Sequence, residues 1–470
     1  MHRGRLSAVL VLMALTGFLT TLDNTVVNVA LPTVQEELGL DVAALEWVAA
    51  SYVLSFGTLL LAGGRVADLA GRRAVMAVGV VVFTVSSCAA ALADSGTALM
   101  AARAVQGAGA ALIVPASLAV VARDLPARRC ATAIGLWTAS LALALALGPV
   151  IGGFVTERWG WTWIFLLNVP FGVLALLLVP AVPSAGRRGT GRWSASLLDV
   201  PGVLLSAVAL FLLTYALVKG GEHTFSTPPV PLFLWLSALT GAAFLLVEAR
   251  AFLPLVDLRM LRDRILVGGV AAQVLWGVGV NGVFFFTALY LQQVLGFSPV
   301  EAGAVFLPLA GALLVCTPFA ERAARILGAH RSIAAGLALV AGGLLLVAGT
   351  GADASYADLQ PGLLLVGVGS ALTTPLTVRS IAGVPATRTG MASGLVSAAR
   401  EISGVFGVVL VGIVLTRTER DALADGVAPQ TAFLDGYDTG LRLAAGCVLL
   451  GAVVSAVALR RPGRHRRGAA

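Results

Sequence analysis

Charged residues are scarce in this 470-residue chain. Asp, Glu, Lys and Arg together make up 12% of the sequence and hydrophobic residues make up 58%, whereas soluble globular proteins are about 25% charged. The mean hydropathy is +0.93. Apolar runs long enough to cross a bilayer recur from end to end, too many for one buried core. The composition excludes a soluble globular protein and indicates an all-α integral membrane protein.

Cysteine, histidine and lysine are also rare. The four cysteines are scattered, without the spacing of a disulfide framework or a metal site, and the four histidines lie in predicted loops or tails. The only lysine, Lys219, is not part of a phosphate-binding loop, which would end in Gly-Lys-Ser/Thr. We therefore expect no metal, no cofactor and no enzymatic activity. Any active transport by this chain must use an ion gradient.

The net charge of +8 does not indicate a nucleic-acid partner. The basic residues are spread over many short loops, as membrane insertion requires, and form no domain-sized patch. The basic start MHRGRL precedes a hydrophobic segment, as in a signal peptide. That segment continues to about residue 30 without a small-residue cleavage site, so we expect an uncleaved first helix.

Fourteen segments are long and apolar enough to be membrane helices. They lie at about 6–30, 43–63, 74–93, 98–121, 131–155, 162–183, 198–218, 230–250, 266–291, 300–321, 332–350, 361–381, 392–415 and 440–460.

The loop charges test this number of spans. With a cytoplasmic N-terminus, 25 of the 32 Lys and Arg residues fall in inside segments and 5 fall outside. One missed span would invert every later loop and destroy this asymmetry. We therefore predict fourteen crossings with both termini in the cytoplasm.

Two polar stretches divide the chain. Residues 184–197, rich in Ser, Gly and Arg, follow the first six helices, and a second polar stretch at about 250–265 precedes the last six. We predict a six-helix bundle at 1–185, a linker with two extra helices at 186–260, and a second six-helix bundle at 261–470. Two six-helix halves favour a repeat-built transporter with its site between them near the bilayer midplane.

The first helix contains LDNTVVNVALP, with Asp23, Asn24 and Asn28 in an apolar segment. With Thr16 and Thr20 they form one polar stripe, which must face protein or water because lipid cannot satisfy it. An ionised carboxylate is costly in dry surroundings. A carboxyl poised between its two protonation states is what proton coupling needs; the alternative is a structural hydrogen bond between helices.

Arg103 lies in the fourth helix, in AARAVQGAGAALIVPAS. At 1.5 Å per residue, Asp23 and Arg103 both fall in the outer half of the membrane. We hypothesise that Arg103 favours the ionised form of Asp23 in one conformation and loses this contact when substrate or a proton arrives. The alternative is an arginine that extends to the headgroups.

Two further motifs contain turn and hinge residues. The loop GGRVADLAGRRAVM holds Gly64, Asp68, Gly71, Arg72 and Arg73, which suit a latch at the cytoplasmic surface as well as an ordinary basic loop. The fifth helix contains LGPVIGGF. Its proline and glycines weaken a helix and let a partner approach, as at a moving interface or in close packing; they are Gly148, Pro149, Gly152 and Gly153.

Together these stretches resemble the major facilitator superfamily, and more narrowly its fourteen-helix drug:proton antiporter family. LDNTVVNVALP, GGRVADLAGRR, RAVQGAGAA and GPVIGG are similar to motifs of helix 1, loop 2–3, helix 4 and helix 5. WTWIFLLNVPFG, LDVPG and ALYLQQVLGFSPVEAGAVFLP are also similar, so the resemblance spans nearly the whole chain. Thr162 and Ala144 depart from the family's usual Arg and Gly.

The resemblance implies site residues. Asp23 becomes the proton-linked acid, Arg103 its modulator, and the helix 5 motif the antiporter hinge. Glu401 replaces a usual Gln and is either a second proton site or a partner of Arg400 or of a neighbouring helix. The loop 2–3 residues become the cytoplasmic gate. Predicted residues of the substrate cavity are Asn24, Asn28, Gln106, Gln273, Trp276, Asn281 and Tyr290.

The sequence therefore predicts a monomeric, proton-coupled exporter of small, largely apolar organic compounds in a bacterial cytoplasmic membrane. The 31 arginines against one lysine are consistent with a GC-rich genome such as an actinomycete's. One alternative is a proton-coupled uptake symporter for a small nutrient, against which the helix 5 motif argues by resemblance. The other is a membrane-embedded sensor or enzyme without active transport.

Overall fold

The computed structural model describes residues 3–124, 127–183, 199–222, 225–251, 254–385 and 388–460. Within these ranges some side chains lie outside the description; they are those of residues 68, 122–124, 127, 128, 130, 131, 134, 135, 138, 142, 146, 389 and 390. The described chain is helical throughout, with no β-strand in those ranges. The all-α prediction is confirmed.

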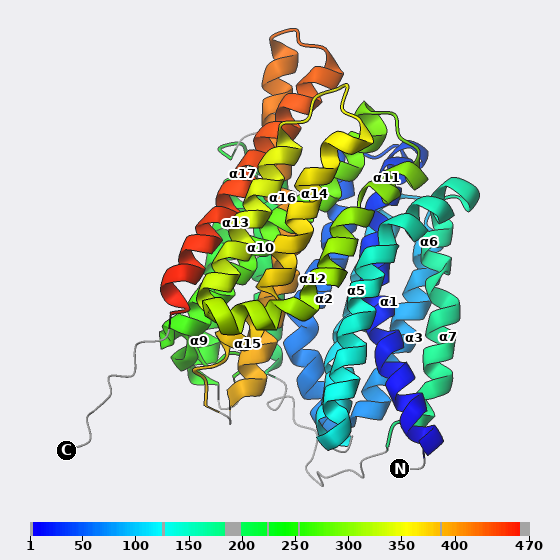
Figure 1. Cartoon of the computed structure of the whole chain (residues 1–470), viewed down its shortest axis with the longest axis vertical. Helices are drawn as coiled ribbons and strands as arrows, with labels where there is room; N and C mark the ends of the chain where they lie inside the picture. Colours follow the sequence, from blue (N-terminus) through cyan, green and yellow to red (C-terminus); the bar gives the residue numbers. More distant parts are fainter. Residues whose placement is uncertain are drawn as a thin grey trace, which may run out of the picture.

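The helices fall into three consecutive groups (Figure 1). The first comprises α1 (Arg3–Leu38), α2 (Val42–Ala70), α3 (Arg72–Ala91), α4 (Gly96–Asp124), α5 (Ala127–Trp159), α6 (Thr162–Leu166), α7 (Asn168–Leu178) and η1 (Val179–Ala181). The second comprises α8 (Val200–Glu222) and α9 (Val230–Arg250). The third comprises η3 (Leu258–Arg262), α10 (Arg264–Leu289), η4 (Tyr290–Val294), α11 (Pro299–Val305), α12 (Leu307–Leu327), α13 (Ala329–Ala348), α14 (Tyr356–Thr373), α15 (Leu376–Ser380), α16 (Thr389–Ala424) and α17 (Pro429–Ala458).

The number of membrane crossings agrees with the sequence. The described residues contain 13 helical spans long and apolar enough to cross a membrane, or 14 when the bent α5 is included. Several spans are interrupted: α6 and α7 belong to one crossing, α11 and α12 to another, and α14 and α15 to a third. The chain is a multi-pass membrane protein.

The bend in α5 has an identifiable cause. Residues Ala139–Leu145 and Leu147–Trp159 are inclined to each other by 43°. Pro149 lies inside this helix, and its ring removes one backbone hydrogen bond and crowds the carbonyl four residues earlier, at Leu145. The bend therefore falls one turn before Pro149, which confirms the predicted weakening of this helix.

Both ends of the described chain lie at the same end of the molecule (Figure 1). The beginning of α1 and the end of α17 define what we call the terminal end; α11 and the connection between α16 and α17 lie toward the opposite, far end. An even number of crossings requires this arrangement. The cytoplasmic orientation of the terminal end stays a prediction.

One of the two extra helices, α8, packs against both halves. Helix α8 contacts α9, and it also contacts α2 of the first half and α16 of the second. The halves contact each other directly through α5 with α11 and α12, α2 with α16, and α1 with α10. The domain boundaries at 185 and 260 stay a prediction, because the linker residues 184–198 lie outside the described ranges.

Two glycines bring the backbones of α5 and α11 into contact toward the far end. A Cβ at Gly153 would collide with the Pro299 carbonyl group and would lie 3.0 Å from the Val300 Cα. Reciprocally, a Cβ at Gly303 would collide with the Pro149 carbonyl group. Only glycine at both positions allows this approach. The helix 5 motif is thus part of the interface between the two halves.

We predict that Gly153→Ala destabilises this structure, because the added methyl meets backbone atoms that cannot rotate away. Overpacking of this kind costs about 1–3 kcal/mol. Gly311→Ala on α12 is the matched control, since a Cβ there has no neighbour within 4 Å. Thermal unfolding of the purified protein should show a lower Tm for Gly153→Ala alone. Equal Tm values for the two variants would contradict the packing.

Candidate functional site

A cluster of polar side chains lies buried between α1, α3, α4 and α7. Its centre is an ion pair in which Arg103 Nη1 lies 2.6 Å from Asp23 Oδ2, and both side chains are inaccessible to solvent. The contact agrees with the similar depth predicted for these two residues, and their position in the outer half of the membrane stays a prediction. The alternative of an arginine that extends to the headgroups is wrong, because Arg103 points into the bundle.

Three groups donate hydrogen bonds to the Asp23 carboxylate. Arg103 Nη1 donates to Oδ2, while Gln106 Nε2 at 2.8 Å and Asn168 Nδ2 at 2.6 Å both donate to Oδ1. A carboxylate accepts all three bonds without a proton of its own. This arrangement therefore fixes the position of the Asp23 carboxyl group against α4 and α7.

The guanidinium of Arg103 has further contacts. Its Nη1 also donates to Gln106 Oε1 at 2.8 Å. Its Cζ lies 4.4 Å from the centre of the Tyr52 ring and 5.8 Å from that of Phe165, so both aromatic faces attract the positive charge. The Nε atom has no hydrogen-bond partner among the described residues. The charge is held by one carboxylate, one amide oxygen and two rings.

Neighbouring helices fix the donors in place. Ser87 Oγ on α3 accepts bonds from Gln106 Nε2 at 3.1 Å and Asn168 Nδ2 at 3.0 Å, and donates to the Phe165 carbonyl at 2.9 Å. Gly107 lets α2 approach α4, because a Cβ there would collide with the Tyr52 carbonyl group. This approach carries the Tyr52 ring to Arg103.

The sequence missed Ser87, Asn168 and Tyr52 as members of this cluster. Asn168 had a usable signal, since it is an amide within WTWIFLLNVPFG, one of the stretches on which the family resemblance rests. Ser87 had only a weak signal, because a serine in a membrane helix commonly bonds its own backbone. Tyr52 had no signal in the sequence, because its contact with Arg103 depends on how α2 packs against α4.

The helix 5 motif packs directly on the helix that carries Asp23. A Cβ at Gly148 would collide with the Thr25 side chain, and a Cβ at Gly152 would lie 2.7 Å from the Val26 carbonyl oxygen. Thr25 and Val26 follow Asp23 on α1 within one turn. A shift of this part of α1 must therefore be transmitted to α5.

Two of the predicted cavity residues are corrected by the structure. Gln106 belongs to the buried cluster around Asp23. Tyr290 belongs to the packing of the second half: its ring stacks on Tyr437 with centroids 4.8 Å apart, and its hydroxyl donates to the Gly351 carbonyl at 2.7 Å. Sequence spacing could not separate inward-facing positions from helix–helix contacts.

The other predicted cavity residues stay predictions. Asn24 and Asn28 are half-buried on α1, and Gln273 is buried on α10. The indole N–H of Trp276 has no partner among the described residues, so it can donate to a ligand. Asn281 donates to the Gly277 carbonyl of its own helix at 2.9 Å.

Glu401 lies on α16, in the second half of the chain. Its side chain is 22% exposed, and its Oε1 lies 3.5 Å from Arg400 Nε. The pair with Arg400 foreseen as an alternative is therefore present. The neighbouring Ile402 packs against Gly57 of α2, so Glu401 lies beside a contact between the two halves.

The predicted gate residues surround a tight turn at the terminal end. Gly71 has φ of 96° and separates α2 from α3. Gly64 faces Pro115, with 3.5 Å from its Cβ position to the Pro115 Cβ, and Arg72 and Arg73 are half-buried. The side chain of Asp68 lies outside the described residues, so the gate stays a prediction. Among the described residues no three His, Cys, Asp or Glu side chains could together hold a metal ion.

Comparison with known families identifies the chain. A model described as Major Facilitator Superfamily matches residues 13–408. The chain belongs to the major facilitator superfamily. Its relatives in this superfamily include the multidrug resistance protein Stp of Mycobacterium tuberculosis, 36% identical over 400 residues that cover 85% of this chain and 74% of that protein.

Other relatives come from Streptomyces species. The puromycin resistance protein pur8 of Streptomyces alboniger is 35% identical over 95% of this chain and 90% of that protein. The tetracenomycin C resistance and export protein of Streptomyces glaucescens is 31% identical over 90% of this chain and 78% of that protein. The named functions of these relatives identify this superfamily member as a transporter and not an enzyme.

Solved structures of distant transporters share the fold. An auto-inhibited peptide transporter of the POT family has a TM-score of 0.71 at 14% identity, over 99% of both chains. A bacterial homologue of the lysosomal transporter Spinster, in an inward-facing and unoccupied conformation, has a TM-score of 0.69 at 15% identity, over 98% of both chains. These likenesses concern the fold alone.

The buried pair predicts a non-additive effect on stability. Asp23→Asn leaves the Arg103 charge buried without its partner, a loss of about 3–5 kcal/mol. Adding Arg103→Met removes that charge, so the double variant should be more stable than Asp23→Asn alone. A double-mutant cycle on thermal or denaturant unfolding measures this coupling. Additive effects of the two substitutions would show that the charges do not interact.

Proposed function

We propose that this protein is a proton-coupled antiporter that exports small, largely apolar organic compounds across a bacterial cytoplasmic membrane. Relatives at 31–36% identity that are named for multidrug, puromycin and tetracenomycin C resistance support this substrate class. Antibiotics are the first compounds to test. The proposal includes cytoplasmic termini, a monomer, and protons as the coupling ion.

The observation that carries the proposal is the fully buried pair of Asp23 and Arg103. A proton that binds a carboxyl oxygen of Asp23 neutralises this side chain and removes its attraction to Arg103. The same proton returns to water when the carboxylate pairs with Arg103 again. The site can therefore exchange one proton for a change in the contact between α1 and α4.

The contacts of α5 extend this change to the second half. Thr25 and Val26 of α1 pack on Gly148 and Gly152, and Gly153 of α5 packs on the α11 backbone at Pro299. Movement of α1 relative to α4 thus acts on the closest backbone contact between α5 and α11. In the proposed cycle the two halves rock about a central site, open first to one side and then to the other.

A proton gradient supplies enough free energy for this cycle. One charge crossing the membrane potential releases about 2.3 kcal/mol per 100 mV, and a pH difference adds to it. In the proposed order, a proton from outside favours release of the compound there, and loss of the proton to the cytoplasm restores inward binding. Trp276, with its unpartnered N–H, is the proposed cavity residue with a donor available to a ligand.

Two rival functions make different demands. A nutrient symporter moves proton and substrate in the same direction, so counterflow in inverted vesicles separates it from an exporter. A sensor or membrane-embedded enzyme binds a compound without moving it against a gradient. The resistance proteins among the relatives favour export over both.

We predict that Asp23→Asn abolishes pH-driven export, because an amide cannot bind and release a proton near neutral pH. Glu401→Gln should retain part of the activity, since Glu401 pairs with the exposed Arg400. Puromycin and ethidium transport into inverted vesicles with an imposed pH difference measures both effects. Wild-type activity in Asp23→Asn together with loss in Glu401→Gln would transfer the proton-binding role to Glu401.

A further inference from the structure

A second cavity, apart from the buried cluster, lies along the membrane-facing side of α2, α4 and α8. It has a volume of about 740 Å³ and lies in the half of these helices near the far end. This volume suits a drug-sized molecule. The residues that carry the argument are Trp47, Ser51, Ser55, Ala104, Phe211 and Tyr215.

Aromatic rings form one wall of this cavity. The Trp47 ring lies 5.5 Å from that of Phe211 and 6.2 Å from that of Tyr215, and Phe211 and Tyr215 are stacked at 6.3 Å. Phe211 is 51% exposed, although its ring contacts those of Trp47 and Tyr215. Rings placed this way offer their faces and edges to a flat aromatic molecule.

Hydroxyl groups of α2 also line this cavity. Ser51, Ser55 and Thr58 recur at helical spacing along the cavity. The hydroxyl protons of Ser51 and Thr58 are donated to carbonyls of their own helix, Val48 at 3.3 Å and Leu54 at 2.6 Å. Their oxygens can therefore accept hydrogen bonds from a ligand with N–H or O–H groups. A lipid acyl chain has no such donor.

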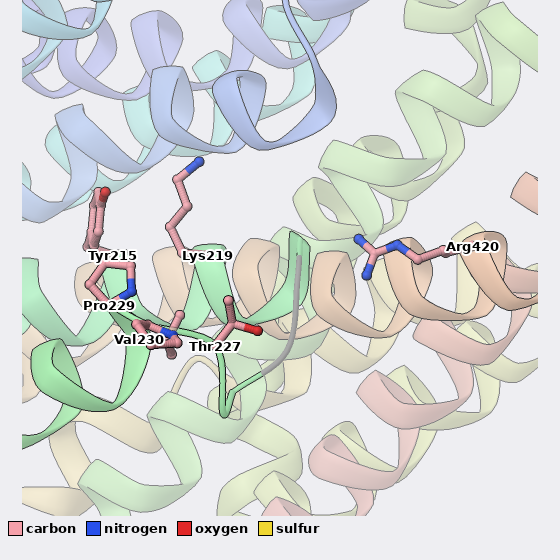
Figure 2. Close-up of a pocket in the computed structure, with 7 residues that line it drawn as sticks. Tyr215, Lys219, Thr227, Pro229, Val230 and Arg420 are labelled. Carbon is pink, nitrogen blue, oxygen red and sulfur yellow. The ribbon is translucent and has the colours of Figure 1, made fainter.

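The cavity continues toward the far end of the molecule. A further cavity of about 600 Å³ shares Tyr215 and Lys219 with it and is also lined by Thr227, Pro229 and Arg420. Figure 2 shows Lys219 extending from its helix toward a helix drawn in blue, with Arg420 on a separate helix across the cavity. The two cavities are therefore adjacent at Tyr215 and Lys219.

The same helices hold the buried ion pair on their other side. Ala104 is the neighbour of Arg103 on α4, and Ser51 is the neighbour of Tyr52, whose ring covers Arg103. Gly107 packs α2 closely against α4, so the cavity and the ion pair are formed by neighbouring residues of the same two helices.

We infer that the cavity between α2, α4 and α8 is a second ligand site, which takes amphipathic organic molecules with an aromatic body and a hydrogen-bond donor directly from the bilayer. This inference rests on the proposed function for its ligand class. It adds a lateral site to the central one, on the outer-leaflet side if the termini are cytoplasmic.

The test uses a full-length chain in which the four native cysteines are replaced. Ser55→Cys places a thiol in the cavity, and Val105→Cys places one on α4, exposed and outside the cavity lining. The rate of modification by N-ethylmaleimide is measured with and without puromycin, and then ethidium. Protection scales as 1 + [L]/Kd, so a probe at four times its Kd should slow Ser55→Cys about fivefold. The rate for Val105→Cys should not change.

Transport of the same probes is measured in parallel. Transport without selective protection of Ser55→Cys by either probe would overturn the lateral site and leave the exporter intact. Protection in Asp23→Asn, with transport lost, would support the site independently of proton coupling. Ala104→Phe, which fills the cavity, should abolish the protection; unchanged protection in that variant would also overturn the assignment.

Discussion

The structure depends on a charge pair that the membrane cannot solvate. Removing a carboxylate and a guanidinium from water costs several kcal/mol per ion, and their attraction offsets this only when further hydrogen bonds satisfy the remaining donors and acceptors. Asp23 meets this condition through Gln106 and Asn168, whereas Arg103 meets it in part: its Nη1 also bonds Gln106, and its Nε has no partner among the described residues. A well-packed hydrophobic pair of similar volume is often at least as stable as a buried ion pair, so stability alone does not account for two charges at this position.

Helix packing connects this pair to the second half of the chain. Glycines of α5 accept the backbone and side chains of α1 on one side and the backbone of α11 on the other. The bend before Pro149 lies within the same helix. Helix α2 covers the pair with Tyr52 and also packs on α16 and α8. The ion pair, the interface between the halves and the lateral cavity therefore have helix α2 in common.

The sequence predicted the crossings, the bend and the similar depth of Asp23 and Arg103, because each follows from local composition, helical rise or proline chemistry. It did not predict Ser87 and Asn168 as partners, since these come from helices distant in the chain. Tyr290 was assigned to a cavity, whereas it stacks on Tyr437. The sequence does not distinguish a tyrosine that lines a cavity from one that packs between helices. Tertiary packing decides which side of an apolar helix faces lipid, protein or a cavity. The order of residue types in an all-apolar segment does not predict this side.

Proton release on ligand binding tests the central claim most directly. The purified protein is held in weakly buffered detergent solution near neutral pH, and the pH change on addition of puromycin is recorded for wild type, Asp23→Asn and Glu401→Gln. If compound and proton compete through Asp23, wild type and Glu401→Gln release protons and Asp23→Asn binds puromycin without releasing any. Equal proton release by Asp23→Asn and wild type would contradict the account.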